Sequence, residues 1–132
     1  MTESTSGSEF PFRELLGFSV DSGAGTSTAR LDVDDRHMNP NGVVHGAVLF
    51  ALIDTAMGGA TMSVVDPGCR CATIDITIRY LAPCLGGTIT ATVSVRKAGR
   101  RIVHLDATAV GDDGTEYATA TGAYAVITPP TG

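Results

Sequence analysis

The chain has few basic residues, and this shortage excludes the main classes of polyanion-binding protein. Among 132 residues, Lys and Arg number 9 against 14 Asp and Glu, which gives a net charge of -5 at pH 7. Binding to nucleic acid or to an anionic membrane surface needs a basic face, so we expect neither as the main partner. The balance still permits a small anionic ligand held by a few local cations.

Cysteines are scarce as well, so an exported, disulfide-stapled protein is not expected. Cys69, Cys71 and Cys84 are odd in number and form no C-x-x-C pair. This pattern suits reduced thiols in the cytoplasm and does not supply the four spaced ligands of a zinc site, so we predict no metal. Residues 1–9 are polar and lack the basic start and apolar stretch of a signal peptide. We expect them to form a disordered tail before a single domain over residues 10–130.

The chain does have a hydrophobic content of 43%, which is enough for a core that needs no disulfide or metal to stabilise it. Clusters of proline, glycine, asparagine and aspartate divide it into segments of regular apolar periodicity. The pattern predicts a short helix over 10–17, strands over 18–24 and 27–33, a loop over 34–44, a helix over about 45–65, and strands over 71–81, 87–97, 101–111 and 116–128. Four strands in hairpin succession make an antiparallel sheet, so the predicted class is α+β.

The strand over residues 71–81 shows the clearest alternation of apolar and polar residues. Its apolar residues are predicted to share one face, namely Ala72, Ile74, Ile76, Ile78 and Tyr80. The polar residues between them are predicted to occupy the opposite face, so the strand is expected to lie with one side on the core.

The long helix is apolar on nearly every face, whereas a surface helix has a polar stripe. A membrane would accommodate such a helix, because about 20 apolar residues span a bilayer, and so would a sheet wrapped around it. Asp54 near its middle, the Gly58-Gly59 pair and the flanking strands argue against a membrane. An acid at the bilayer centre costs about 2.5–3.5 kcal/mol. We therefore predict an antiparallel sheet wrapped around one long central helix.

Asp54 is the single acid of this helix, and no cation lies at helical spacing from it. Burying an unpaired carboxylate costs several kcal/mol, so the group should become protonated or face a wet cleft. Carboxylates in apolar settings concentrate at functional sites, which favours a functional role for Asp54. A structural acid that caps another group or pairs with an arginine from a strand is the alternative.

The start of the helix carries a second candidate site. The first backbone N–H groups of a helix have no internal partner, and the absence of a side chain at Gly46 lets a ligand approach them. Gly46 is therefore a candidate oxyanion donor, although an ordinary helix start would have the same sequence. Asp54 lies eight residues further on, or about 12 Å along the helix, which is too far for one reacting carbonyl. We therefore predict a homodimer in which two subunits share each active site.

The stretch Asn39-Pro40-Asn41-Gly42-Val43-Val44-His45-Gly46, followed by Asp54, resembles the signature of hotdog-fold acyl-CoA thioesterases. The most similar branch is typified by the phenylacetate-degradation thioesterases and human thioesterase superfamily member 2. The strand order resembles that family over essentially the whole chain beyond the tail. One departure is visible, because the family often has Gly-Gly after the histidine and here Ala47 follows Gly46. The resemblance implies a hotdog fold and dimers that pair again into homotetramers.

The resemblance also implies catalytic roles. The Gly46 N–H would polarise the thioester carbonyl, Asp54 of the other subunit would be nucleophile or general base, and Asn39 would orient the attacking water or the carbonyl. A thiolate departs readily, so one carboxylate plus an oxyanion hole suffices, and we expect no cofactor. His37 and His104 are predicted to be core or surface residues rather than ligands.

Four further residues would contact the substrate. His45 would shape the pocket through a hydrogen bond to the thioester sulfur or to the loop, and Thr73 would lie beside the acid. Arg100 and Arg101, at a strand turn, would meet the CoA phosphates, although a solvated hairpin tip would have the same residues.

The predicted activity is hydrolysis of an aryl- or medium-chain acyl-CoA to free acid and CoA. Small residues around the acid, Gly58, Gly59 and Ala60, suggest room for the acyl group. Two other functions fit part of the sequence. A hotdog dehydratase or hydratase of acyl thioesters would also use a loop histidine and a helix acid, for which His45 and Asp54 are candidates. A non-catalytic acyl-CoA-binding module on the same fold would not need Asp54.

Overall fold

The computed structural model describes residues 10–130, and the predicted tail over residues 1–9 lies outside them. The elements in chain order are α1 (Pro11–Leu16), β1 (Ser19–Gly23), β2 (Thr26–Asp32), the short 3-10 helix η2 (Asp35–His37), α2 (Gly46–Met62), β3 (Arg70–Tyr80), β4 (Thr88–Ala98), β5 (Ile102–Gly111) and β6 (Glu116–Ile127). The strands form one antiparallel sheet in the order β1-β2-β4-β5-β6-β3. The predicted α+β class is confirmed.

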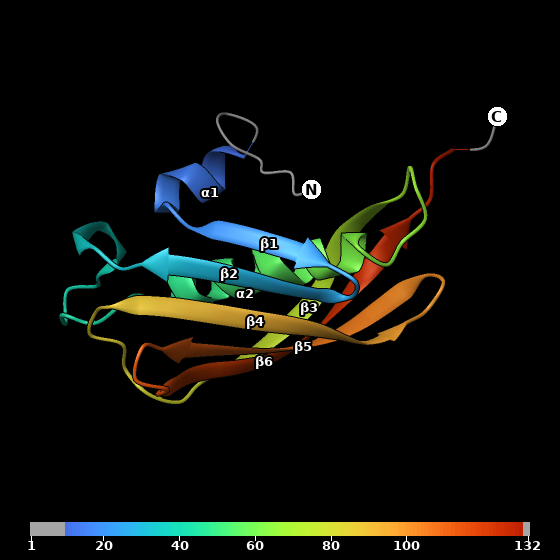
Figure 1. The fold of residues 1–132 in the computed structure, drawn as a ribbon. Helices are drawn as coiled ribbons and strands as arrows, with labels where there is room; N and C mark the ends of the chain where they lie inside the picture. Colours follow the sequence, from blue (N-terminus) through green and yellow to red (C-terminus); the bar gives the residue numbers. More distant parts are fainter. Residues whose placement is uncertain (1–9, 131–132) are drawn as a thin grey trace.

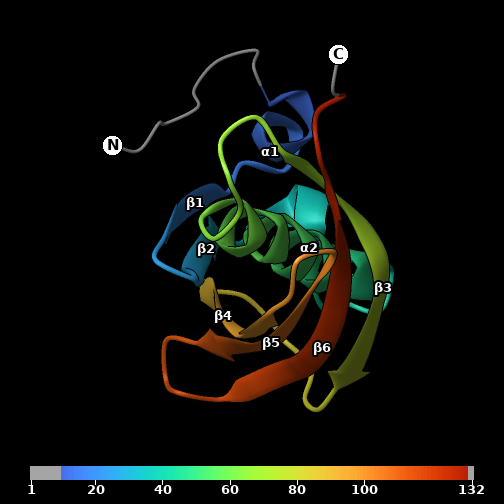
Figure 2. The same ribbon diagram turned by 90° about the vertical axis from the view of Figure 1, so that its right-hand side faces the viewer.

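The sheet curves around α2, which lies in its concave face (Figure 1, Figure 2). The helix packs against all six strands, so its apolar faces are covered on several sides. The buried residues of α2 are Val48, Leu49, Ala51, Leu52, Ile53, Ala56, Met57, Ala60 and Thr61. Within residues 10–130, no helix is long and apolar enough to cross a membrane. The predicted sheet wrapped around a central helix is therefore confirmed.

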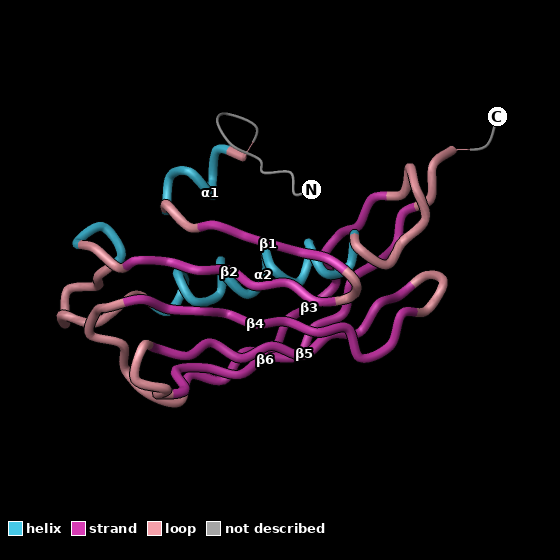
Figure 3. The backbone as a smooth tube through the Cα atoms, viewed as in Figure 1, coloured by secondary structure: helices cyan, strands magenta, loops and turns pink. Residues whose placement is uncertain are grey.

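The helix ends three residues earlier than the apolar pattern predicts. The Ser63 side chain donates to the Ala60 carbonyl at 2.7 Å, and its hydroxyl accepts the Gly25 N–H at 2.8 Å. A serine that bonds to the helix carbonyls and to a neighbouring turn competes with further helix, and this stops α2 at Met62. Loops lie at both ends of the sheet, and α2 runs from one end of the molecule towards the other (Figure 3).

An irregularity in β3 changes which of its residues face α2. Thr73 pairs with Tyr124 and Asp75 pairs with Ala123, so Ile74 has no partner of its own across the ladder. One extra residue of this kind is a β-bulge, and it shifts the alternation of side chains by one position.

The predicted inward face of β3 is therefore wrong before the bulge and right after it. The residues that contact α2 or the core are Cys71 and Thr73 before it, and Ile76, Ile78 and Tyr80 after it. Ala72 is exposed, and Ile74 is 51% exposed on the outer side. The bulge lets one strand present a polar residue to Asp54 and apolar residues to the core.

The small residues after Asp54 do not leave room for an acyl group as predicted. A Cβ atom on Gly59 would overlap the Ser22 hydroxyl and lie 3.2 Å from the Ser22 Cβ atom. Ser22 and Ser27 are hydrogen-bonded to each other at 2.7 Å, so both side chains are held in place. Ala60 is fully buried. Gly59 therefore serves the close packing of α2 on Ser22 of β1 and Ser27 of β2. Gly58 and Gly59 are both half-buried, but only Gly58 has space for an added methyl group.

The adjacent glycines give a matched pair of variants. We expect Gly59→Ala to lower the free energy of unfolding by about 1–3 kcal/mol, because its methyl group must displace the Ser22–Ser27 pair. Gly58→Ala should be neutral or should stabilise by up to about 1 kcal/mol, because the nearest atom to a Cβ there lies 3.9 Å away and alanine favours the helix. Chemical denaturation of both variants measures the difference, and equal stabilities would contradict it.

Candidate active site

Asp54 accepts hydrogen bonds from two neutral side chains. The Thr73 hydroxyl donates to Asp54 Oδ1 at 3.0 Å. The Tyr124 hydroxyl contacts the same oxygen and lies 2.7 Å from the Asp54 main-chain carbonyl. None of the ion pairs among the described residues involves Asp54, so a structural acid paired with an arginine finds no support there.

Tyr124 is a site residue that the sequence analysis did not identify. Its side chain is 2% exposed, and burial followed by the hydrogen bond with Asp54 raises its pKa, so the phenol keeps its proton. The signal in the sequence is one of contrast, because the inward residues of β6 that precede Tyr124 are small: Ala118, Ala120 and Gly122. The partner of Tyr124 depends on the register of β6 against β3 and on the position of α2, which local periodicity does not reveal.

Gly46 and His45 form the second half of the predicted site, at the start of α2. The His45 Nδ1 atom accepts the Ala47 N–H at 2.9 Å, which caps the helix. A neutral imidazole that accepts at Nδ1 carries its proton on Nε2, and the side chain is exposed. None of the hydrogen bonds of the described residues uses the Gly46 N–H, which is one of the orphan donors of a helix start.

Tyr80 closes one side of this helix start. Its hydroxyl donates to the Gly46 carbonyl at 2.8 Å, and a Cβ atom on Gly46 would lie 3.1 Å from the tyrosine ring. A groove of about 330 Å³ begins here, lined by Val44, Gly46, Leu49, Tyr80, Leu81, Ala82, Pro83 and Cys84. The lining is mostly apolar, so the groove suits a hydrocarbon group next to the Gly46 N–H.

Asn39 organises the loop that leads into α2. Its side-chain oxygen accepts the Asn41 N–H at 2.8 Å and the Val43 N–H at 3.4 Å. The Asn39 main chain also exchanges hydrogen bonds with the loop, from its N–H to the Val43 carbonyl and from the Gly42 N–H to its carbonyl. The amide oxygen is therefore occupied within the loop, and the NH2 group is the part of the side chain that is left for a substrate.

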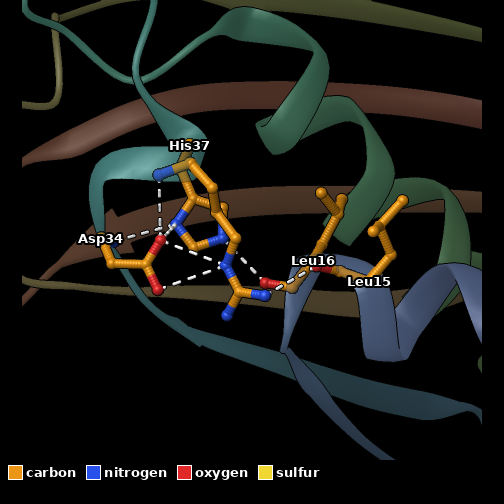
Figure 4. Close-up of polar contacts among 5 residues, drawn as sticks. Leu15, Leu16, Asp34 and His37 are labelled. Atoms are coloured by element: carbon orange, nitrogen blue, oxygen red, sulfur yellow. Dashed lines mark hydrogen bonds and ion pairs between the residues drawn. The ribbon is translucent and has the colours of Figure 1, made fainter.

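His37 anchors this loop to α1 (Figure 4). The residue is fully buried, its Nδ1 atom accepts the Asp34 N–H at 2.9 Å, and its Nε2 atom lies 2.7 Å from the Leu16 carbonyl. The His37 carbonyl in turn accepts the His45 N–H at 2.9 Å. His37 is thus a core residue, as one of the predicted alternatives had it, and it holds His45 in place through the main chain. His104 is exposed on the outer face.

Arg100 and Arg101 lie at the turn between β4 and β5, and both are exposed. The Arg101 carbonyl accepts the Val126 N–H at 2.8 Å, and Arg70 pairs with Ile127 on the other side of β6. Strands are about 4.8 Å apart, so the backbones of Arg70 and Arg101 lie about 10 Å from each other. We call Arg70, Lys97, Arg100 and Arg101 the basic end, a cluster found at the end of the sheet where α2 terminates (Figure 1).

The predicted residues therefore fall into three groups. Asp54 and Thr73 meet each other, His45 and Gly46 meet at the start of α2, and the arginines lie at the basic end. Gly46 and Asp54 are on one continuous helix, about 12 Å apart along its axis, so one chain does not bring them to a common point.

Comparison with known proteins gives the family. The model of the thioesterase superfamily matches residues 41–118, more than half of the chain. A putative esterase of Haemophilus influenzae is 35% identical over 74 residues, which are 56% of this chain and 54% of that protein. The chain therefore matches about half the length of this curated relative.

Solved structures show the same fold over most of the chain. The PaaI protein of the E. coli phenylacetic acid degradation operon gives a TM-score of 0.81 at 28% identity, covering 90% of this chain and 86% of that one. The thioesterase HI1161 of Haemophilus influenzae gives 0.83 at 26% identity, covering 89% and 82%. A conserved protein of Pseudomonas aeruginosa gives 0.83 at 29% identity, covering 88% and 93%. The chain has the predicted hotdog fold and belongs to the thioesterase superfamily, and the proteins that it resembles include ones named esterase and thioesterase.

Proposed function

We propose that the protein is an acyl-CoA thioesterase that hydrolyses an aryl- or medium-chain acyl-CoA to the free acid and CoA. The observation that carries this proposal is the position of the Asp54 carboxylate. Two neutral donors from β3 and β6 hold it, and it lies on the same helix that starts with Gly46. Asp54 acts as nucleophile or general base, and the Gly46 N–H stabilises the oxyanion.

The chemistry needs few groups. Attack on the thioester carbonyl carbon forms a tetrahedral oxyanion, which the Gly46 N–H and the positive end of the α2 dipole stabilise. The carbon–sulfur bond then breaks and CoA leaves as a thiolate. His45, whose Nε2 carries the proton while Nδ1 caps the helix, is the donor best suited to approach the sulfur. If Asp54 attacks directly, water hydrolyses the resulting anhydride; if it is a base, it takes a proton from the attacking water.

The two halves of the site are joined in a dimer, and β3 suggests how. β3 is an edge strand of the sheet; Tyr80 near one end contacts Gly46 and Thr73 nearer the other contacts Asp54. Two copies that pair their β3 edges antiparallel around a two-fold axis near Ile76 would place Tyr80 close to the partner's Thr73. Gly46 of one subunit then approaches the partner's Asp54. Pairing would also satisfy the open backbone groups of the edge.

The charge distribution supports CoA as the leaving group. The basic end gathers four of the nine cations of an acidic chain, close to the end of β3 that leads to Thr73 and Asp54. Clustered arginines bind phosphates by charge-assisted hydrogen bonds. The apolar groove beside Gly46 lies on the other side of the carbonyl and suits the acyl group. We extend the proposal to a dimer of such dimers, as the family resemblance implies. The odd number of cysteines without a C-x-x-C pair supports a protein that works in the cytoplasm with reduced thiols.

Replacement of Asp54 tests the activity. We expect Asp54→Asn to lower kcat for acyl-CoA hydrolysis by about 10²–10⁴-fold, because a positioned base or nucleophile contributes that much. The amide keeps an oxygen for Thr73 and Tyr124, so the fold should be retained. Thiol release from a panel of aryl- and medium-chain acyl-CoAs measures the rate. The exposed Asp21→Asn, on the opposite edge strand β1, is a control that keeps wild-type activity. A wild-type protein that releases no thiol but hydrates an enoyl thioester would contradict the proposal.

Mixed dimers test the shared site. Gly46→Pro removes the N–H while proline remains acceptable at the first helical position. Each of Gly46→Pro and Asp54→Asn alone should be inactive, whereas co-expressed chains should regain about a quarter of wild-type activity. Half of the dimers are then mixed, and each mixed dimer has one site free of both defects. Mixed dimers isolated with two different tags and lacking activity would contradict a shared site.

The basic end can be tested by its effect on CoA binding. We expect Arg100→Ala together with Arg101→Ala to raise KM for an acyl-CoA about tenfold, through lost phosphate contacts, with little change in kcat. The same acyl group on a short thiol without phosphates should be hydrolysed as by the wild type, and added salt should reduce the difference. Arg30→Ala, an exposed change on β2, away from β3 and from the basic end, is the control. An equal rise in KM for both substrates would contradict phosphate binding.

A further inference from the structure

The hydrogen bonds to Asp54 converge on one of its two carboxylate oxygens. Thr73 donates to Oδ1 and the Tyr124 hydroxyl contacts Oδ1, while none of the hydrogen bonds of the described residues uses Oδ2. A carboxylate held through one oxygen by two donors from different strands has a fixed rotamer and a free second oxygen. Oδ2 is therefore the atom available for the reaction.

The two donors form a cross-strand pair. Thr73 of β3 lies directly opposite Tyr124 of β6, and the bulge at Ile74 begins immediately after this pair. Without the bulge, the alternation that places Ile76 and Ile78 on the core would turn Thr73 away from α2. The register of β3 on β6 thus brings both hydroxyl groups to Asp54 together.

The Tyr124 hydroxyl has a polar role as well as a packing role. The side chain is 2% exposed, so a hydroxyl without a partner would cost about 1–3 kcal/mol, and Asp54 supplies its contacts. The phenol is a donor at every working pH, because burial and the Asp54 charge raise its pKa. It has one proton, which an ionised Oδ1 attracts more strongly than the neutral Asp54 carbonyl does.

The other neighbours of Asp54 are neutral. Cys71 of β3 is the second titratable group near it, and burial followed by the charge of Asp54 raises the pKa of that thiol. Among the described residues no Lys, Arg or His pairs with Asp54 from the helix or from the strands. The stabilisation of the charged carboxylate therefore comes from hydroxyl groups.

Given the proposed thioesterase function, we propose that Tyr124 is a positioning residue that holds Asp54 Oδ1 so that the charged carboxylate presents Oδ2 to the thioester. Tyr124 does not touch the substrate. It acts through Asp54, with Thr73 as the second donor.

Tyr124→Phe removes the hydroxyl and keeps the ring that fills the core. We expect kcat to fall about 10- to 100-fold and KM to change by less than about threefold, as for the loss of one hydrogen bond to a charged group. The acid limb of the pH–rate profile should move to higher pH by about 0.5–1 unit, because the charged form loses a donor. Tyr117→Phe, a change at another buried tyrosine of β6, is the matched control and should leave both the rate and the pH profile unchanged.

A double-mutant cycle makes the test independent of a general loss of structure. Thr73→Val removes the second donor. Because both donors bind the same oxygen, the effect of the double change on the activation free energy from kcat should differ from the sum of the two single effects. Thermal unfolding of each variant checks the fold.

If the wild type is active, Asp54→Asn is inactive and Tyr124→Phe keeps the wild-type rate and pH profile, the proposed role of Tyr124 is wrong and the proposed function stands. If neither wild type nor variants hydrolyse acyl-CoA, the proposed function itself is wrong.

Discussion

The burial of α2 against all six strands determines where the rest of the site lies. A helix whose faces are nearly all apolar has to be covered on several sides, and a curved antiparallel sheet does this with one short chain. The cover leaves Asp54 and Gly46 half-buried, the first beside Thr73 of the edge strand β3 and the second at the start of α2. A polar group on such a helix is stable only where a strand supplies a hydrogen bond or where solvent reaches it, so the location of the acid follows from the packing of the core.

The rigidity of the same helix separates the two chemical groups. An α-helix of 17 residues does not bend enough to bring Gly46 and Asp54 to one atom, since each residue advances the chain by about 1.5 Å. The helix dipole favours the oxyanion at its start, whereas the hydroxyl groups that hold the acid come from strands that cross the middle of the helix. In the proposed thioesterase one chain carries two half-sites, and a two-fold axis at the β3 edge is the simplest operation that combines them.

The sequence predicted the elements well, because each is bounded by strong turn residues and has a clear period. It predicted Asp54, Gly46 and His45 as site residues through the contrast of one acid with an apolar helix and through the family signature. It did not predict the bulge at Ile74, because the apolar alternation of β3 continues through it unchanged and the irregularity exists only in the ladder with β6. Tyr124 was missed for the same reason. Its partner lies 70 residues away and is fixed by the register of another strand.

The neutral surroundings of Asp54 are a compromise between stability and reactivity. An arginine beside a half-buried carboxylate would pair with it strongly, but it would also lower the basicity and nucleophilicity of the acid and occupy the oxygen that must react. Hydroxyl donors on Oδ1 stabilise the charge less and leave Oδ2 free. The cations are kept at the basic end, where Arg70 lies three residues before Thr73 along β3 and Arg101 lies across β6, and solvent screening weakens their effect on Asp54. Under the proposed function, an acidic chain would in this way attract the polyanionic CoA thioester at one end and keep a reactive carboxylate at the centre.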